Sequence, residues 1–200
     1  KLAAGAAQGV ALAAPEVNRG ALKFYNQWRD TRGALDLNGH LLRTDGTSRS
    51  LAIAPDESGV AIGTDGRLYY YANDGSAKWS ALTLSAYAVN VSGDNRLVIS
   101  ANADGTLRWY RRADGRLLLT LFVAPDKKRW ALVSPSGFYD TSVGGEELIG
   151  WHVNRSREEA ADFFPVSRLR ARFYRPDVIT GIITTVDDRA AFKQAAAALG

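Results

Sequence analysis

The sequence contains no cysteine and no methionine, and only two histidines among its 200 residues. The absence of cysteine excludes disulfide bonds, thiolate metal ligands and a cysteine nucleophile. His40 and His152 lie far apart, and neither has a neighbour at the spacing of a metal site, so we expect structural histidines and no bound metal. Because the chain starts at Lys1 without a methionine, we expect it to be a piece of a longer protein.

Long apolar runs are also absent. No stretch approaches the roughly 18 uncharged apolar residues of a membrane-spanning helix, and the first residues lack the apolar block of a signal peptide. Hydrophobic residues make up 46% of the chain and charged residues 23%, which is the ordinary range for a globular domain. We therefore expect a soluble chain with no membrane association.

Charge is nearly balanced along most of the chain. The 25 Lys and Arg exceed the 21 Asp and Glu by a formal +4, an excess that favours solubility more than a polyanionic partner. The exception is a group of arginines within eight residues, interleaved with Phe173 and Tyr174. Its members are Arg168, Arg170, Arg172 and Arg175, which form a candidate polyanion contact.

Doublets of adjacent ring-bearing residues recur at intervals of about 40 residues. Two of these doublets follow an Asp-Gly turn by a few residues. The doublets are Phe24-Tyr25, Tyr70-Tyr71, Trp109-Tyr110 and Trp151-His152. A period of this length indicates a repeated supersecondary unit.

The two central repeats each divide into four short strand candidates. In the first they lie at 50–54, 60–63, 68–71 and 78–84; in the second at 86–92, 97–101, around the Trp109 doublet, and at 116–123. Four β-rich segments joined by tight turns are typical of a propeller blade. We predict an all-β fold, a β-propeller of about four blades belonging to a larger ring, whose open edges favour association.

The doublets have a structural explanation. Successive side chains of a strand face opposite sides of its sheet, so one ring packs against the next blade and the other against the preceding blade. We therefore predict that the doublets belong to the core and do not stack on a ligand. The Asp-Gly turns are explained by hairpin chemistry, because glycine adopts a positive φ without steric cost.

The pattern changes after Val153. Ser156 and Glu159 have the spacing of a capping box, which predicts a short helix through 160–164 that Pro165 stops. A second helix is predicted at 167–174, and a last one from Asp187 or Asp188 to the end of the chain. These predictions divide the chain into propeller blades at 1–154 and a helical extension at 155–200 that leads to a missing domain.

The repeats resemble degenerate WD repeats, with Gly39-His40 at the place of the Gly-His pair. A longer part, roughly Ser50 to Val178, resembles the terminal propeller part of bacterial multidomain proteins that pair WD repeats with a caspase-like peptidase domain. The segments GGEELIGWHVNR and ADFFPVSR carry this resemblance most specifically. The resemblance implies a regulatory or scaffolding propeller and transfers no peptidase Cys-His pair, because cysteine is absent.

These observations favour a protein-interaction or regulatory scaffold that is not an enzyme and binds no cofactor. No phosphate loop, hydrolase elbow or calcium loop is present in the sequence. The expected partner is another protein, the remaining blades of the same parent, or a second copy. One alternative is a pyrroloquinoline-quinone-type propeller, which GTDGRLYYYANDGSAKW resembles. The other is nucleic-acid binding through the arginine cluster, which we do not expect.

Overall fold

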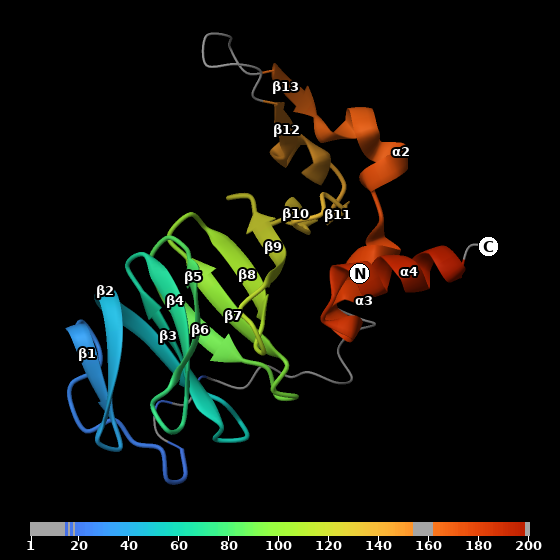
Figure 1. Cartoon of the computed structure of the whole chain (residues 1–200). Helices are drawn as coiled ribbons and strands as arrows, with labels where there is room; N and C mark the ends of the chain where they lie inside the picture. The colour runs from blue at the N-terminus through green and yellow to red at the C-terminus, as the bar shows by residue number, and fades with distance from the viewer. Residues whose placement is uncertain (1–14, 16, 18, 154–161, 199–200) are drawn as a thin grey trace. The chain divides into compact units, whose positions relative to one another are not determined.

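The computed structural model describes residues 15, 17, 19–153 and 162–198 (Figure 1). The chain divides into two compact units, an N-terminal unit of Lys1–Leu117 and a C-terminal unit of Leu118–Gly200. Within the described residues, all helical segments belong to the C-terminal unit. The N-terminal unit is built from antiparallel strands.

Five strands in chain order form the first sheet of the N-terminal unit. They are β1 (Arg32–Leu37), β2 (His40–Ile53), β3 (Gly59–Thr64), β4 (Arg67–Ala72) and β5 (Ala77–Leu82). The turns β2–β3 and β4–β5 are closed by Asp56 and Asp74, whose carboxylates accept the backbone N–H two residues further on. Such local hydrogen bonds favour tight turns, so short polar segments between apolar strands give a meander.

Three further strands of the unit follow the same pattern. They are β6 (Ala86–Val91), β7 (Leu97–Asn102) and β8 (Thr106–Arg111), paired antiparallel in chain order. Asp94 and Asp104 close their turns as Asp56 and Asp74 do in the first sheet. The same kind of local hydrogen bond therefore closes turns in both groups of strands.

The two sheets pack face to face, with β2 and β3 against β6 (Figure 1). The residues between them are mostly small on the first sheet and β-branched on the second. The cluster consists of Ala52, Ala54, Ala61, Leu68, Tyr70, Ala86, Val89, Val91, Val98 and Tyr110. Burial of each larger side chain contributes about 1.5–3 kcal/mol before conformational entropy is counted. This inter-sheet core is the packing expected of neighbouring propeller blades.

One glycine is required by the close approach of the sheets. A Cβ on Gly63 would lie 2.7 Å from the carbonyl oxygen of Ala86, too close for any side chain. The Ser50 hydroxyl donates to that same oxygen at 2.7 Å. A hydrogen bond within the core therefore fixes the spacing that the glycine permits.

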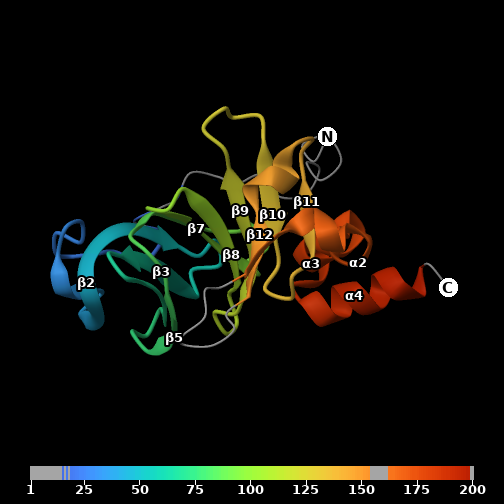
Figure 2. The same cartoon turned by 90° about the horizontal axis from the view of Figure 1, so that it is seen from above.

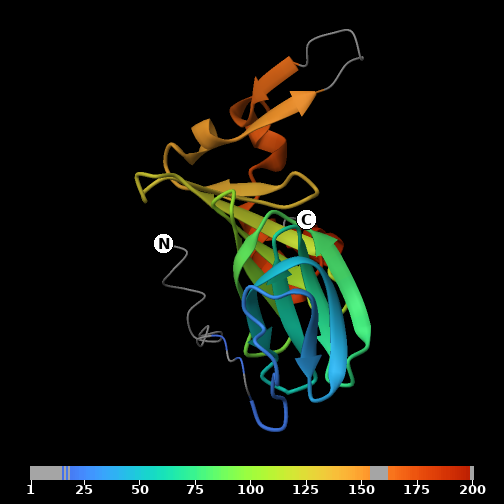
Figure 3. The ribbon, with the colours of Figure 1, turned by 90° about the vertical axis from the view of Figure 1, so that its left-hand side faces the viewer.

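Strand β2 changes partner along its length. Up to Thr47 it pairs with β1, and from Ser48 onward it pairs with β3 across a shift in register. Figure 3 shows the strand bending so that β1 and the first half of β2 fold over the sheet. The fully buried side chains of Leu35, Leu37 and Leu42 then pack on the outer face of the first sheet.

Two tyrosine hydroxyls hold this fold-over in place. The hydroxyl of Tyr69 accepts the backbone N–H of Asp45 at 2.9 Å, and that of Tyr71 donates to the carbonyl of Arg43. Burial raises the pKa of Tyr71 to about 12, so the hydroxyl keeps its proton at neutral pH. On this face of the first sheet, β1 and the first half of β2 therefore cover apolar residues that an unpaired blade would expose.

The C-terminal unit contains short strands and helices (Figures 1 and 2). Its strands are β9 (Leu117–Val123), β10 (Trp130–Val133), β11 (Tyr139–Thr141), β12 (Gly150–Val153) and β13 (Asp162–Pro165). Its helical segments are η1 (Gly145–Leu148), η2 (Val166–Leu169), α2 (Arg170–Phe173), α3 (Pro176–Thr185) and α4 (Asp188–Ala197). Strands β9, β10 and β11 are antiparallel, and β12 and β13 form a hairpin.

Helices α3 and α4 pack against each other at the end of the chain. Val178, Ile179 and Ile182 of α3 are buried, and Gly181 allows Ala191 of α4 to approach closely. Asp187 caps α4, since its carboxylate accepts the N–H groups of the next residues, as acceptors at a helix start do.

The structure confirms the predicted fold class, antiparallel sheets of propeller type followed by short helices. The central strand candidates and the last helix, capped by Asp187, lie where the sequence placed them. The helix predicted through 160–164 is wrong at its described end, because Asp162–Pro165 is strand β13. Ser156 and Glu159 lie outside the described residues. Helix α3 was not predicted.

Tyr110 provides a test of the inter-sheet core. It is 2% exposed, and its buried hydroxyl has no hydrogen-bond partner within the described residues. We expect Tyr110→Phe to leave the free energy of unfolding unchanged or to raise it by up to about 1 kcal/mol, because an unpaired buried hydroxyl costs desolvation. Tyr110→Ala should lower it by about 3–5 kcal/mol through the cavity it leaves. Denaturant unfolding measures both, and a loss above about 1 kcal/mol in the phenylalanine variant would contradict this core packing.

Candidate interaction surface

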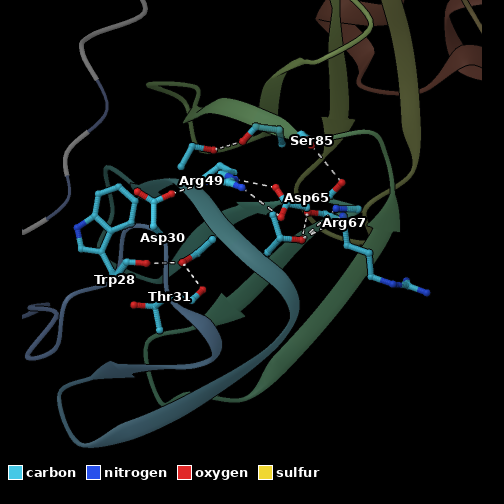
Figure 4. A network of polar contacts seen from close by, with 12 residues as sticks. Trp28, Asp30, Thr31, Arg49, Asp65, Arg67 and Ser85 are labelled. Atoms are coloured by element: carbon cyan, nitrogen blue, oxygen red, sulfur yellow. Dashed lines mark hydrogen bonds and ion pairs between the residues drawn. The ribbon is translucent and has the colours of Figure 1, made fainter.

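One end of the N-terminal unit carries a network centred on Arg49 of β2 (Figure 4). Its guanidinium donates to Asp30 at 2.6 Å and, through Nε, to Asp65 at 2.7 Å. Asp65 lies in the β3–β4 turn, and its backbone carbonyl accepts the Ser85 hydroxyl at 3.3 Å. Three segments distant in sequence are therefore tied together at this end.

The second half of β2 is anchored beside this network. The buried hydroxyl of Ser48 donates to the carbonyls of Trp28 and Thr31 (Figure 4). The segment that holds Trp28 and Asp30 is therefore fixed to the point where β2 changes partner. These hydrogen bonds therefore keep Asp30 in position to pair with Arg49.

The electrostatics of the Arg49 network keep its charges in place. The hydrogen bond from Arg49 lowers the pKa of Asp65, against a smaller opposing effect of burial. Both side chains are therefore ionised at neutral pH. Because both are substantially exposed, the pair contributes modestly to stability and mainly fixes geometry.

A second network of polar contacts lies beside the connection between β5 and β6, which also contains Ser85. Arg108 of β8 pairs with Asp104 at 2.6 Å and donates to the Thr83 hydroxyl at 3.3 Å. Burial raises the pKa of Asp104, but hydrogen bonds from the Thr106 hydroxyl and N–H and the charge of Arg108 outweigh it, so the net shift is downward. This carboxylate is also held ionised.

Exposed apolar side chains flank the two networks. Leu82 at the end of β5 is 75% exposed, Leu84 in the connection is 52% exposed and Tyr87 of β6 is 63% exposed. The β6–β7 register shifts between Ala86 and Ala88, so Tyr87 occupies a β-bulge, a device that redirects a side chain. We name Leu82, Leu84 and Tyr87, with the adjoining Arg49 and Arg108 networks, the blade-end surface.

At the opposite end of the sheets, Arg112 joins one sheet to the other. Its guanidinium donates to the Ser58 hydroxyl and, at 2.9 Å, to the Tyr70 hydroxyl, and it pairs with Asp56 at 3.3 Å. Its backbone carbonyl accepts the indole N–H of Trp79 at 2.6 Å. These contacts lie between the two sheets of the N-terminal unit and fix the position of one sheet relative to the other.

The predicted doublets occupy different environments. Phe24 is half-buried and its backbone forms an isolated β-bridge with Leu37, whereas Tyr25 is exposed. Trp109 of β8 is half-buried beside the buried Tyr110. In hairpin β12–β13 Trp151 is half-buried and His152 is exposed.

Tyr70 and Tyr71 lie on opposite faces of the first sheet. Tyr70 belongs to the inter-sheet core and stacks on Trp79 with ring centroids 5.7 Å apart. Tyr71 belongs to the core beneath the β1–β2 fold-over. Both tyrosines are buried and give no free ring face for a ligand.

The four clustered arginines separate into two kinds. Arg170 pairs with Glu146, and Arg175 pairs with Asp177 at 2.6 Å. Arg168 and Arg172 are exposed, and neither has an acidic partner within the described residues. Arg168 lies over the Phe164 ring and Arg172 over the Phe173 ring, at 5.2 and 5.4 Å from the ring centroids.

Another cleft of the C-terminal unit is lined by residues that include Glu146, Arg170 and Tyr174. Glu146 accepts the Tyr139 hydroxyl at 2.9 Å and pairs with Arg170, whose guanidinium lies 3.9 Å from the Tyr174 ring centroid. Burial and the contact with Glu146 raise the pKa of Tyr139, and burial raises that of the neighbouring Asp140. Glu146 is therefore committed to structural partners.

Neither histidine joins a cluster of ligands. His40 is exposed at the start of β2, and His152 is exposed on β12. Across residues 19–153 and 162–198, no three acidic or histidine side chains converge in the manner of a metal site. In that part of the chain, no helix has the length and apolarity needed to cross a bilayer.

Comparison with known proteins yields distant structural likeness alone. No protein-family model matches the chain, and no curated protein sequence does. The structure of U3-55K is similar over 50% of this chain and 37% of that one, at 12% identity and a TM-score of 0.37. BamB from Moraxella catarrhalis is similar over 66% of this chain and 48% of that one, at 15% identity and a TM-score of 0.42. The chain thus spans less than half the length of either protein.

Acid should weaken the fold through the turn carboxylates. The pKa of Asp65 and Asp104 is lowered, and that of Asp126 falls to about 2 because the backbone N–H and then the side chain of Arg129 donate to it. A lowered folded-state pKa means that the stabilisation is complete above the unfolded value of about 4 and is lost as pH falls through the folded value.

We therefore expect the thermal midpoint to stay level from pH 7 to about pH 5 and to drop between about pH 4 and pH 2. Asp104→Asn should melt below the wild type at pH 7 and together with it near pH 2, because protonation removes the same charge. Circular-dichroism melts at these pH values measure the difference. An equal difference at both pH values would show that the charge of Asp104 contributes nothing.

Proposed function

We propose that the chain is a non-catalytic scaffold of propeller type that binds a protein partner through the blade-end surface. The observation that carries the proposal is the exposure of Leu82, Leu84 and the bulged Tyr87 beside charges that are already paired and fixed. Apolar and aromatic groups at the centre of a polar rim are the composition of protein interfaces. Tyrosine in particular supplies large contact area with little conformational freedom to lose.

The same networks support a role without catalysis. A general base at neutral pH needs a pKa near 7, and the carboxyl groups at the blade end have pKa values shifted in the opposite direction. Their guanidinium partners lie at ion-pair distance. The arrangement favours recognition of a surface over proton transfer.

The wider assignment follows from sequence resemblance. We propose that the blades are of the WD-repeat type and belong to a bacterial parent protein with a caspase-like peptidase domain, divided near 154 into propeller and helical extension. The remaining blades of that parent, or a second copy, are then natural partners. No contact of the described residues favours a quinone-binding propeller. Pairing of Arg170 and Arg175 with acids weakens the nucleic-acid alternative.

A site-specific photo-crosslink tests the proposed surface. A benzophenone amino acid at position 84 should yield a discrete crosslinked species with one protein, or with a second copy, in cells that produce the parent. The matched control is position 41, where Leu41 is 60% exposed on the β1–β2 hairpin, outside the blade-end surface.

The expected crosslink at position 84 should disappear when Tyr87→Ala and Leu82→Ser are introduced together, while the fold is retained because all three side chains are exposed. Equal crosslinking at positions 41 and 84, or none at position 84, would contradict the assignment. Hydrolysis of peptide or ester substrates by the pure chain, abolished by one substitution at Asp65 or Asp104, would contradict the non-catalytic role.

A further inference from the structure

Among the described residues of the C-terminal unit, two guanidinium groups lie over aromatic rings and have no acidic partner. Arg168 of η2 and Arg172 of α2 lie four residues apart along consecutive helical segments, so they follow each other by about one turn. Like charges at this spacing repel each other, and nothing in the described residues neutralises them. Each is instead oriented by the ring beneath it.

The two supporting rings belong to residues placed next to Trp151 by different contacts. Phe164 stands directly opposite Trp151 in hairpin β12–β13, and the Phe173 ring centroid lies 5.1 Å from that of Trp151. Arg172 is therefore linked to Trp151 through the Phe173 ring, and Arg168 lies over the ring of the residue that pairs with Trp151 in the hairpin. Leu169, between the two arginines in sequence, is itself substantially exposed.

Trp151 also lines an apolar cleft of about 410 Å³. Its other walls come from β10, the β10–β11 turn, η1 and η2, and include Val133, Pro135, Leu148 and Val166. A Cβ on Gly137 would lie 2.6 Å from the Trp151 ring, so the glycine is required for the indole to sit in this wall. An apolar cleft thus adjoins two arginines that have no acidic partner among the described residues.

We propose that this site binds an acidic, leucine-containing segment of a partner protein. An apolar side chain enters the cleft beside Trp151, and two carboxylates pair with Arg168 and Arg172. Guanidinium groups bind carboxylates through two parallel hydrogen bonds, and a stacked ring fixes the plane in which they do so. The site lies in the C-terminal unit and does not depend on the blade-end surface.

A peptide fits this site better than a nucleic acid does. Binding of single strands requires free ring faces for base stacking, whereas guanidinium groups lie over both Phe164 and Phe173. The neighbouring arginines carry their own acids, Glu146 and Asp177, so the charge of this segment is mixed in sign. A uniform polyanion would meet these carboxylates, while a short acidic segment need contact only two cations.

Fluorescence anisotropy with the full chain tests the proposal. The probe is a labelled peptide of about twelve residues in which glutamates flank leucine pairs, and the comparators are its glutamine analogue and an oligothymidylate of equal charge. We expect the acidic peptide to bind, with its affinity reduced at least about tenfold by Arg168→Glu with Arg172→Glu, since each charge-assisted pair is lost and repulsion is introduced.

The matched control is Lys127→Glu with Lys128→Glu, an exposed pair on the β9–β10 turn of the same unit that changes the net charge equally. This control should bind like the wild type, and Arg168→Gln with Arg172→Gln should weaken binding without reversing charge. Circular-dichroism melts verify that each variant folds. Equal loss in the lysine and arginine variants, tighter binding of the oligothymidylate, or no binding of the acidic peptide would each overturn the proposal.

Discussion

The close approach of two antiparallel sheets through small side chains is the constraint on which the N-terminal unit depends. Ala52, Ala54 and Ala61 leave room for the larger residues of the second sheet, and Gly63 allows the backbone to reach Ala86. With that spacing, Tyr70, Trp79 and Tyr110 stack in a row, and Arg112 reaches across to Asp56. A rigid pair of sheets then fixes the charged networks and the exposed side chains at its ends.

The second determinant is the bend of β2. A blade that lacks a neighbour exposes an apolar face and favours association. Here β1 and the first half of β2 fold over that face, and the hydroxyls of Tyr69 and Tyr71 fasten them through backbone contacts. The fold-over therefore reduces the surface that another blade or another copy would have to cover.

Features that depend on local chemistry were predicted correctly from the sequence. Features that depend on contacts with residues distant in the sequence were not. The strands and Asp turns of the central repeats were identified because alternation and turn residues are local signals, and so was the cap at Asp187. Asp162–Pro165 forms a strand because it pairs with Gly150–Val153, which propensity does not reveal. The second predicted helix ended at 174, and the start of a further helix at Pro176 was missed, although proline is tolerated in the first turn of a helix.

The candidate sites show the same division. The arginine cluster was visible in composition, but the pairing of Arg170 depends on Glu146, which is 24 residues away. The blade-end surface gave no sequence signal, because Leu82 and Leu84 continue an ordinary strand pattern and the bulge at Tyr87 is a matter of register with β7. Whether an apolar side chain is exposed depends on how its strand pairs with its neighbours, and the amino-acid composition does not show this.

The most direct test of the account is a double-mutant cycle across the two sheets. Trp79 of β5 and Tyr110 of β8 have ring centroids 6.3 Å apart, so Trp79→Ala and Tyr110→Ala should show a coupling of about 0.5–1.5 kcal/mol in the free energy of unfolding. The control cycle combines Tyr110→Ala with Trp28→Ala, because Trp28 packs on the other hydrophobic core. The effects of these two substitutions on the free energy of unfolding should be additive within about 0.5 kcal/mol. Additivity of the Trp79 and Tyr110 substitutions would contradict the stacked-sheet architecture.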